Sequence, residues 1–270
     1  MSDLIIEEFE IKHEDDFNIV PPCIVFNRLE RRVFPVEDIS AINHLGLSVI
    51  VVHGGGKNIK KELDKHKIES KFIDGLRVTD ENTMTIVEKA LLELNTEILN
   101  NLTNKEANAK SVTPKSENII KITPEKKELG FVGTPKEVNK EVLLSIVREK
   151  KVPIIVPLGI GDDGKIYNIN ADVAAAAIAK EINSRRLLLM TDVEGVLDKD
   201  KKLISEINSE TANNMINDQS ISGGMIPKIN TCIDAVNNGV TGVVIVDGRR
   251  QNSLLFEIFS DKGAGTLIRK

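Results

Sequence analysis

The chain has 270 residues, of which 41% are hydrophobic, 29% charged and only 3% aromatic, with no tryptophan. This length suits one large domain or two lobes, and the composition is that of a globular protein with an aliphatic core. A formal net charge of -5 and the scarcity of aromatic side chains argue against a nucleic-acid partner, which would require a basic surface and stacking platforms.

The N-terminal residues 1–17 are acidic and contain no apolar segment. No apolar run in the chain approaches the length of a membrane span. We therefore expect a soluble, cytoplasmic protein without a secretory signal or a membrane partner. Cys23 and Cys232 lie far apart and outside any metal-ligand spacing, so we expect reduced thiols and no metal site built from protein side chains.

Short β-branched runs that end in glycines or polar residues recur along the chain, each followed by a helical stretch. They lie at residues 48–52, 152–157, 187–190 and 243–246. Continuous apolar runs of this kind are typical of parallel strands that are covered on both faces. The alternation of strands and helices predicts an α/β sandwich.

Three helices are predicted where several signals agree, at residues 137–151, 171–182 and 223–238. The first has an apolar face, the second is rich in alanine, and the third ends before Gly239, a typical left-handed stop. Residues 104–129 are polar and rich in lysine. They predict either a surface β-hairpin or an irregular solvated excursion.

Three successive glycines, Gly54, Gly55 and Gly56, follow the strand predicted at residues 48–52 and precede a helix. Glycines let backbone N–H groups approach a ligand closely, and the N-terminus of the helix adds positive potential. The segment therefore predicts an anion site, although the same glycines would also suit a tight strand-to-helix turn. Their spacing matches neither the P-loop nor the dinucleotide-binding fingerprint. We interpret His53, just before them, as part of the loop scaffold.

Four further segments place polar residues in comparable positions. Arg77 lies in a short strand-like stretch, where it could hold a carboxylate or make only a surface ion pair. Asp172, at the start of the alanine-rich helix, could serve a site or merely cap that helix. Lys228 lies one turn into a helix that opens with two glycines, and could reach an anion there. Residues 191–195 place a hydroxyl, a carboxylate and a glycine after a buried strand.

These five segments, in this order and spacing, resemble the N-acetylglutamate kinase family from about residue 45 to the C-terminus, apart from residues 90–125. The final VDGRR, EIF and GAGTLI segments are similar to those of its arginine-inhibited bacterial members. The resemblance implies a three-layer α/β sandwich around a mainly parallel, roughly eight-stranded sheet. It also implies an N-terminal lobe, residues 1–183, for amino-acid binding and dimerisation, and a C-terminal lobe, residues 184–270, for ATP.

The activity implied by the resemblance is phosphorylation of the side-chain carboxylate of N-acetyl-L-glutamate by ATP, a step of arginine biosynthesis that yields an acyl phosphate. Gly55 and Gly56 would present N–H groups to the γ-phosphate and the reacting carboxylate. Arg77 would hold a carboxylate of the substrate, and Asn168 would bind its amino-acid end. A carboxylate nucleophile needs no general base at neutral pH, so positioning and charge neutralisation suffice.

Lys228 would neutralise charge on the transferring phosphoryl group, with Asp172 holding the lysines in position. Mg²⁺ would arrive with ATP and be bound mainly by phosphates and water. The resemblance also implies a homodimer or a homohexamer, with arginine as a candidate inhibitor. The nucleotide pocket would be lined by Thr191, Asp192, Gly195 and Leu197.

The first loop departs from the family pattern. The first apolar run ends at Phe26, where the family has the lysine of Lys-x-Gly-Gly, and Arg28 and Leu29 stand where two glycines are expected. One interpretation is a working kinase in which Arg28, Arg31 or Arg32 supplies the missing charge. Another is a catalytically impaired regulatory or nucleotide-binding relative. A kinase for another acidic amino acid, such as aspartate, is the third.

Overall fold

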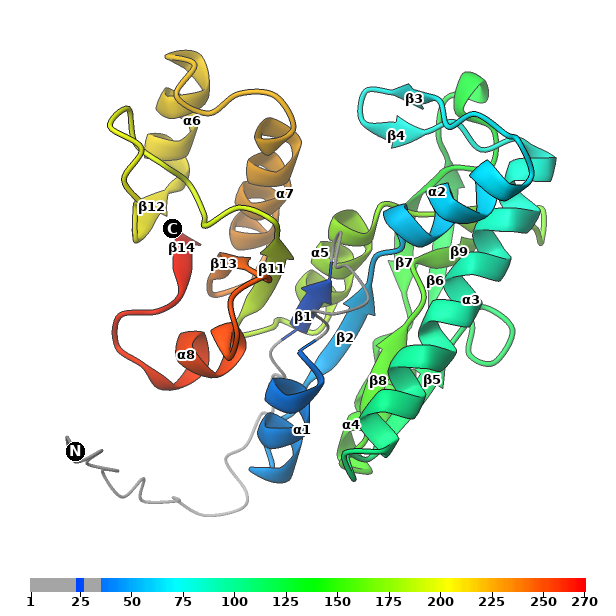
Figure 1. The fold of residues 1–270 in the computed structure, drawn as a ribbon, viewed down its shortest axis with the longest axis horizontal. Helices are drawn as coiled ribbons and strands as arrows, with labels where there is room; N and C mark the ends of the chain where they lie inside the picture. The colour runs from blue at the N-terminus through cyan, green and yellow to red at the C-terminus, as the bar shows by residue number, and fades with distance from the viewer. Residues whose placement is uncertain (1–22, 27–34) are drawn as a thin grey trace.

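The computed structural model describes residues 23–26 and 35–270, and a sheet of eight strands runs through the middle of the molecule (Figure 1). Its five central strands and one edge strand are mutually parallel, and two strands at the other edge run in the opposite direction. In spatial order the strands are β12 (Glu206–Asn208), β14 (Gly265–Arg269), β13 (Val243–Asp247), β11 (Leu187–Thr191), β1 (Cys23–Phe26), β2 (Ile50–His53), β8 (Val152–Ile155) and β5 (Ala109–Val112).

Helices cover this sheet on both faces. They are α1 (Val36–His44), α2 (Gly56–Lys65), α3 (Glu81–Thr103), α4 (Lys140–Arg148), α5 (Ala171–Glu181), α6 (Ser209–Asn217), α7 (Met225–Asn237) and α8 (Ser253–Phe259), with a short 3₁₀ turn at Lys127–Leu129. Within the described ranges, no helix is both long enough and apolar enough to cross a membrane.

Alternate residues of the central strands face opposite layers. Ile50 and Val52 of β2 belong to the core under α4, α5 and α7, while Val51 belongs to the core under α1, α3 and α8. Because successive side chains of a strand point to opposite faces, a run that is apolar throughout must be covered on both sides. The predicted three-layer sandwich around a mainly parallel sheet is therefore confirmed.

A smaller sheet and a hairpin complete the fold. The sheet has the order β10 (Ile166–Asn168), β9 (Leu158–Ile160), β6 (Ile120–Pro124) and β7 (Gly133–Val138), and the hairpin joins β3 (Phe72–Ile73) to β4 (Leu76–Arg77). The secondary structure of residues 104–129 differs from both predictions. Their first strand, β5, is an edge of the large sheet, and β6 pairs with β7 of the small one.

Two of the predicted helices agree with the structure to within two residues, α5 and α7. Gly239, just beyond α7, has a positive φ of 110°, as its predicted role as a stop requires. The helix predicted from residue 137 is wrong at its start, because residues up to Val138 form β7. Asn139 caps the helix, since its side chain accepts a hydrogen bond from the N–H of Val142.

Candidate active site

The carboxyl ends of β2, β1 and β11 lie side by side at one edge of the large sheet, because the three strands are parallel and in register. The backbone of Phe26 pairs with His53 on one side and with Met190 on the other. The segments that leave these ends, residues 54–56 and residues 192–197, therefore start from neighbouring points. This is the edge at which open α/β sheets place their ligands.

Phe26 ends β1, so the residue that stands at the family's lysine position lies at this edge. The side chains proposed to replace the lysine charge, Arg28, Arg31 and Arg32, lie outside the described residues, as does Leu29. The interpretations of the first loop therefore stay predictions.

Helix α2 begins directly from the glycine loop. Gly55 is its N-cap, no side chain caps it, and its first turn contains no acidic residue. Its first N–H groups can therefore serve an anion. A Cβ at Gly55 would collide with the side chain of Leu91 on α3, whereas a Cβ at Gly56 would meet nothing within 4 Å. Packing explains the glycine at position 55, whereas the space beside Gly56 is open and accessible to a ligand.

Arg77 on β4 lies beside this loop. Its guanidinium donates to Ser70 Oγ at 2.5 Å and to the carbonyl oxygen of Gly56 at 3.5 Å. It also stacks on the ring of Phe72, with 4.7 Å between Cζ and the ring centroid. Burial lowers the pKa of Arg77, but a guanidinium stays charged at neutral pH. The structure thus brings two predicted substrate residues, Arg77 and Gly56, into contact, and places the guanidinium group against the glycine loop.

Asp172 does not cap α5. The cap is Asn170, whose side-chain oxygen accepts from the N–H groups of Asp172 and Val173. The carboxylate of Asp172 instead accepts from Lys228 Nζ at 2.6 Å, and the exposed fractions of these two side chains are 9% and 10%. The predicted pairing of Asp172 with a lysine is therefore present in the structure, and the capping interpretation is wrong.

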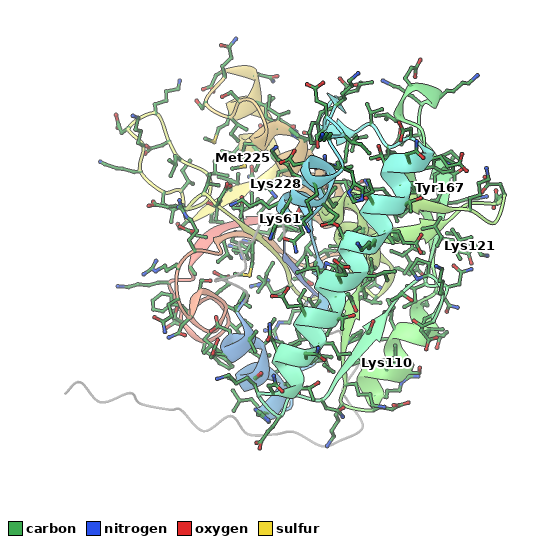
Figure 2. The ribbon with its side chains drawn as sticks, turned by 45° about the vertical axis from the view of Figure 1, so that its right-hand side comes forward. Lys61, Lys110, Lys121, Tyr167, Met225 and Lys228 are labelled. Atoms are coloured by element: carbon green, nitrogen blue, oxygen red, sulfur yellow. The ribbon has the colours of Figure 1, made fainter. Side chains whose placement is uncertain are left out.

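Helix α7, which carries Lys228, resembles α2 at its start. Gly224 is its N-cap without a capping side chain, and the first turn contains no acidic residue. A Cβ at Gly223 or Gly224 would meet nothing within 4 Å, and Gly223 has a left-handed φ of 56°. Figure 2 shows Lys228 and Met225 side by side on α7, toward the middle of the molecule. The N–H groups of Met225 and Ile226 donate to the carbonyl oxygens of Ser222 and Gly223, so the buried ammonium group of Lys228 and the positive end of the helix dipole are what this helix start offers an anion.

Asn168 ends β10, two residues before the cap of α5. Its backbone N–H donates to the carbonyl oxygen of Phe131, in the segment just before β7. Asn168 therefore joins the small sheet to the helix that carries Asp172.

The predicted nucleotide residues follow β11. Thr191 ends the strand and is buried, and its hydroxyl lies 3.4 Å from a carboxylate oxygen of Asp192. Gly195 has a φ of 147°, and a Cβ there would approach the side chain of Leu203 to 2.6 Å. Leu197 pairs with Leu203 in a short antiparallel bridge. The loop therefore folds back on itself, and only glycine fits at position 195.

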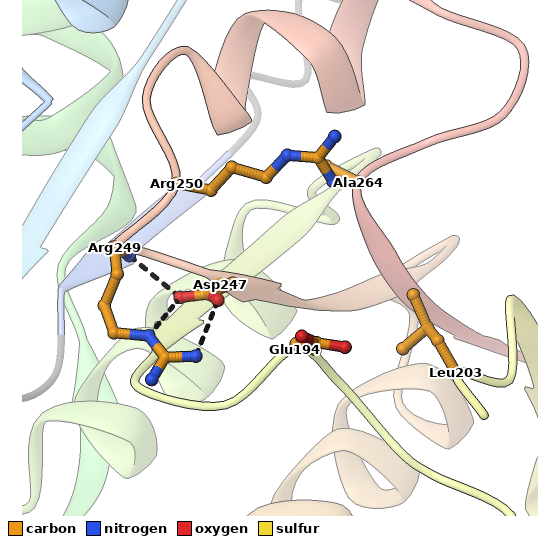
Figure 3. Close-up of a pocket in the computed structure, with 6 residues that line it drawn as sticks. All are labelled: Glu194, Leu203, Asp247, Arg249, Arg250 and Ala264. Atoms are coloured by element: carbon orange, nitrogen blue, oxygen red, sulfur yellow. Dashed lines mark hydrogen bonds and ion pairs between the residues drawn. The ribbon is translucent and has the colours of Figure 1, made fainter. Parts of the chain in front are cut away.

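A pocket of about 390 Å³ opens beside this loop (Figure 3). In its lining, Arg249 donates to both carboxylate oxygens of Asp247, at 2.9 and 2.8 Å, which lowers the pKa of that carboxyl group. Sequence reasoning did not assign Asp247 or Arg249 to a site, although an aspartate that ends a parallel strand could have indicated one. The lining residues are Glu194, Leu203, Asp247, Arg249, Arg250 and Ala264.

The chain resembles known proteins over most of its length. A family model described as the amino acid kinase family matches residues 35–247. Acetylglutamate kinases of Pelagibacter ubique and Clostridioides difficile are 49% and 46% identical, over 98% and 87% of this chain and 92% and 84% of their own lengths. The structure of smu.665 from Streptococcus mutans UA159 matches with a TM-score of 0.78 and 29% identity, over 92% of this chain and 97% of that one. This chain therefore belongs to the amino acid kinase family and, within it, to the acetylglutamate kinases.

Proposed function

We propose that this protein transfers the γ-phosphoryl group of ATP to the side-chain carboxylate of N-acetyl-L-glutamate, in arginine biosynthesis. The observation that carries the proposal is the buried pair of Asp172 and Lys228 at the uncapped start of α7. A lysine in this setting offers a fixed positive charge to a phosphoryl group, and curated relatives with this activity in their name span nearly the whole chain.

The chemistry requires only positioning and charge neutralisation. The attacking carboxylate is already ionised at neutral pH, so no general base is needed, and the oxygens that gain charge need fixed donors. The N–H groups of Gly55 and Gly56 would bind the γ-phosphate and the attacking carboxylate. Lys228 would neutralise the transferring group, and Asp172 would keep the lysine ammonium in place.

The two ligands would bind on opposite sides of the carboxyl ends of β2, β1 and β11. On the β2 side, Arg77 would hold a carboxylate of N-acetylglutamate, and Asn168 would bind its amino-acid end. Lys228, one turn into α7, fits the phosphates of ATP, and the positive end of the helix dipole adds to its charge. Mg²⁺ would be bound by the phosphates and water, and would supply further charge neutralisation. The remaining nucleotide contacts would come from Thr191, Asp192, Gly195 and Leu197.

We infer that residues 1–183 bind the amino acid and residues 184–270 bind ATP. The boundary falls between α5 and β11, and β11 with the later strands forms one half of the large sheet. Assembly as a homodimer or homohexamer, inhibition by arginine and a cytoplasmic location are further proposals that rest on the family.

A catalytically impaired relative remains the second candidate, because Phe26 ends β1 where the family has a lysine. The relative from Pelagibacter ubique aligns over 267 residues, so the similarity to an acetylglutamate kinase reaches into this N-terminal segment. That extent favours a working enzyme.

The test is an acyl-phosphate trap. The protein is incubated with Mg²⁺-ATP and hydroxylamine, and the hydroxamate is measured with N-acetylglutamate, glutamate or aspartate as substrate. We expect hydroxamate from N-acetylglutamate alone. Formation from aspartate or glutamate instead would favour a kinase for another acidic amino acid. Tight ATP binding in calorimetry without hydroxamate from any substrate would favour the impaired relative.

A further inference from the structure

We propose that Asn95 is a positioning residue, which acts through the ring of His53 to fix the peptide between Gly54 and Gly55 and so aims the N–H of Gly55 at the reacting groups. The inference rests on the proposed role of Gly55. It assigns a task to two buried polar side chains that otherwise have none in the site.

His53 is the last residue of β2, and only 1% of it is exposed. Its Nδ1 lies 3.0 Å from the carbonyl oxygen of Gly54, the next residue, and its Nε2 lies 3.1 Å from Nδ2 of Asn95. Asn95 is equally buried, in the middle of α3. A chain of polar contacts therefore runs from α3 through the ring to the glycine loop.

The orientation of the Asn95 amide follows from its other neighbours. Its Nδ2 lies 2.9 Å from the carbonyl oxygen of Ile154, which can only accept. Its Oδ1 accepts from the hydroxyl of Ser111 at 2.5 Å. The nitrogen must therefore face both Ile154 and His53, and it donates to both.

The tautomer of His53 follows in turn. Since Nε2 accepts from Asn95, the proton of the neutral ring is on Nδ1, and Nδ1–H donates to the carbonyl oxygen of Gly54. Burial lowers the pKa of His53 to about 4, so the ring stays neutral at physiological pH. Asn95 thus selects the one neutral tautomer that can hold the Gly54 carbonyl.

Holding this carbonyl fixes the next N–H. In a trans peptide the C=O of one residue and the N–H of the next point in opposite directions, and no cis peptide occurs among the described residues. With the Gly54 carbonyl turned toward the His53 ring, the N–H of Gly55 points away from it. A peptide between two glycines has little steric preference of its own, so an external partner must set its orientation.

Two matched pairs of variants test the proposal. Asn has Nδ2 one bond beyond Cγ, as His has Nδ1, so His53→Asn retains a donor for Gly54, whereas His53→Leu removes it. Asn95→Leu removes the donor to the ring, and Asn100→Leu makes the same change at an exposed position of α3. We expect kcat to fall about 10- to 100-fold in His53→Leu and Asn95→Leu. In His53→Asn and Asn100→Leu we expect it to stay within about three-fold of the native value.

A spectroscopic readout separates positioning from general destabilisation. Long-range ¹H–¹⁵N spectra of the imidazole groups report the tautomer of each histidine, and the His53 signal is identified by its absence in His53→Asn. We expect the Nδ1–H tautomer in the native protein and a smaller share of it in Asn95→Leu, where only the Gly54 carbonyl still favours it. A native Nε2–H tautomer would overturn the proposal, as would native kcat in both leucine variants.

The amide resonance of Gly55 keeps the proposal testable if N-acetylglutamate is not phosphorylated. On addition of Mg²⁺ and the non-hydrolysable nucleotide AMP-PNP, we expect this resonance to shift in the native protein and in His53→Asn, but not in His53→Leu. If no shift occurs in the native protein, Gly55 does not face the phosphate and the inference is wrong, whatever the substrate.

Discussion

Two ion pairs join the same two helices, α5 and α7, at opposite ends. Asp172 and Lys228 meet near the helix starts, and Lys180 and Asp234 meet near the helix ends. Both pairs have an N–O distance of 2.6 Å. The side chains of the first pair are 9% and 10% exposed, whereas those of the second are 31% and 53% exposed.

The difference in exposure distinguishes the pair of the proposed site from a surface pair. Each helix is followed by a strand of the large sheet, so both run antiparallel to the strands and their starts lie at the carboxyl edge. Burying an ion pair costs much of what the charges gain, so such a pair is weak support for a stabilising role. A buried pair at the edge where ligands bind is better explained by function. The exposed pair at the other edge is an ordinary surface contact.

The N-termini of the helices also differ, in their caps and in the charge of their first turn. Helices α3, α4, α5 and α6 have side-chain caps and an acidic residue in the first turn. Helices α2 and α7 begin at glycine with neither. Side-chain caps use up the free N–H groups and acidic residues oppose an anion. The start of α2 is therefore left open, whereas at the start of α7 the N–H groups of Met225 and Ile226 donate to the carbonyl oxygens of Ser222 and Gly223 and leave Lys228 as the donor.

The largest effect is expected at Lys228. Replacing Lys228 with Met should lower kcat for hydroxamate formation by about 100- to 1,000-fold, because a preorganised donor to the transferring group is lost. Lys180→Met, the same change at the other end of the helix pair, should leave kcat within about two-fold.

Folding must be controlled in this comparison, since breaking a buried pair typically costs about 3–5 kcal/mol. The double variant Asp172→Asn, Lys228→Met removes both charges and should regain much of the lost thermal stability while remaining inactive. Native activity in the double variant would remove the pair from the mechanism.

Asp172→Asn should lower kcat by about 100-fold, because the shape is kept but the carboxylate that holds Lys228 is lost, and small misplacements are costly. Asp234→Asn is the matched change at the exposed pair and should have no effect on kcat. Steady-state rates of both variants, together with circular dichroism to confirm folding, give the comparison. Equal rates in the two variants would return Asp172 to a structural role.

Arg77→Ala should raise KM for N-acetylglutamate by about 10- to 150-fold, which corresponds to the loss of about 1.5–3 kcal/mol for a charged hydrogen bond. KM for ATP should change much less, because the glycine loop that Arg77 contacts is proposed to bind only the γ-phosphate of ATP, and the other nucleotide contacts are proposed at α7 and after β11. Arg148→Ala, at an exposed position of α4, is the control. An increase in KM for ATP alone would assign Arg77 to the nucleotide.

The free energy of unfolding should depend on pH through the buried ring of His53. The pKa of His53 is lowered to about 4 in the folded protein, so below its ordinary value the unfolded chain binds a proton that the native state does not. Stability should therefore rise with pH between about 4 and 6.5, and the protein should be about 2 kcal/mol less stable at pH 5 than at pH 7 from this group.

Urea unfolding at the two pH values measures this contribution. His53→Asn should remove it, whereas His44→Asn, at the exposed end of α1 on the opposite edge, should leave it in place. An unchanged pH dependence in His53→Asn would mean that the ring titrates normally.

The smallest effect is expected at the exposed pair. A double-mutant cycle on Lys180 and Asp234 should give a coupling free energy of about 0.2–1 kcal/mol that decreases with added salt. A coupling above about 2 kcal/mol would contradict the contrast between the two ends, since exposed pairs are screened by water.

The sequence was most informative where a single run of residues determines the secondary structure. The apolar runs that became β2, β8, β11 and β13 could be predicted because both faces of these strands are buried. Strand β7 could not, because its residues Gly133–Val138 contain no apolar run and pair only with β6.

The site was harder to predict because its contacts join distant parts of the chain. The sequence left open whether Asp172 serves a site or caps its helix, and only the fold brings Lys228, 56 positions away, to Asp172. The contact of His53 with Asn95 spans 42 positions, and no local pattern indicates it. From the sequence, His53 was interpreted as part of the loop scaffold, and this contact adds Asn95 of α3 to that scaffold.

A crystal structure with Mg²⁺, AMP-PNP and N-acetylglutamate tests the central claim most directly, namely that the carboxyl edge between α2 and α7 is the active site. We expect Lys228 Nζ and the N–H groups of residues 55 and 56 within about 3 Å of γ-phosphate oxygens, with Arg77 on a carboxylate of the substrate. A nucleotide whose γ-phosphate lies away from Lys228, or one that binds near Lys180 at the other end of the helix pair, would contradict the account.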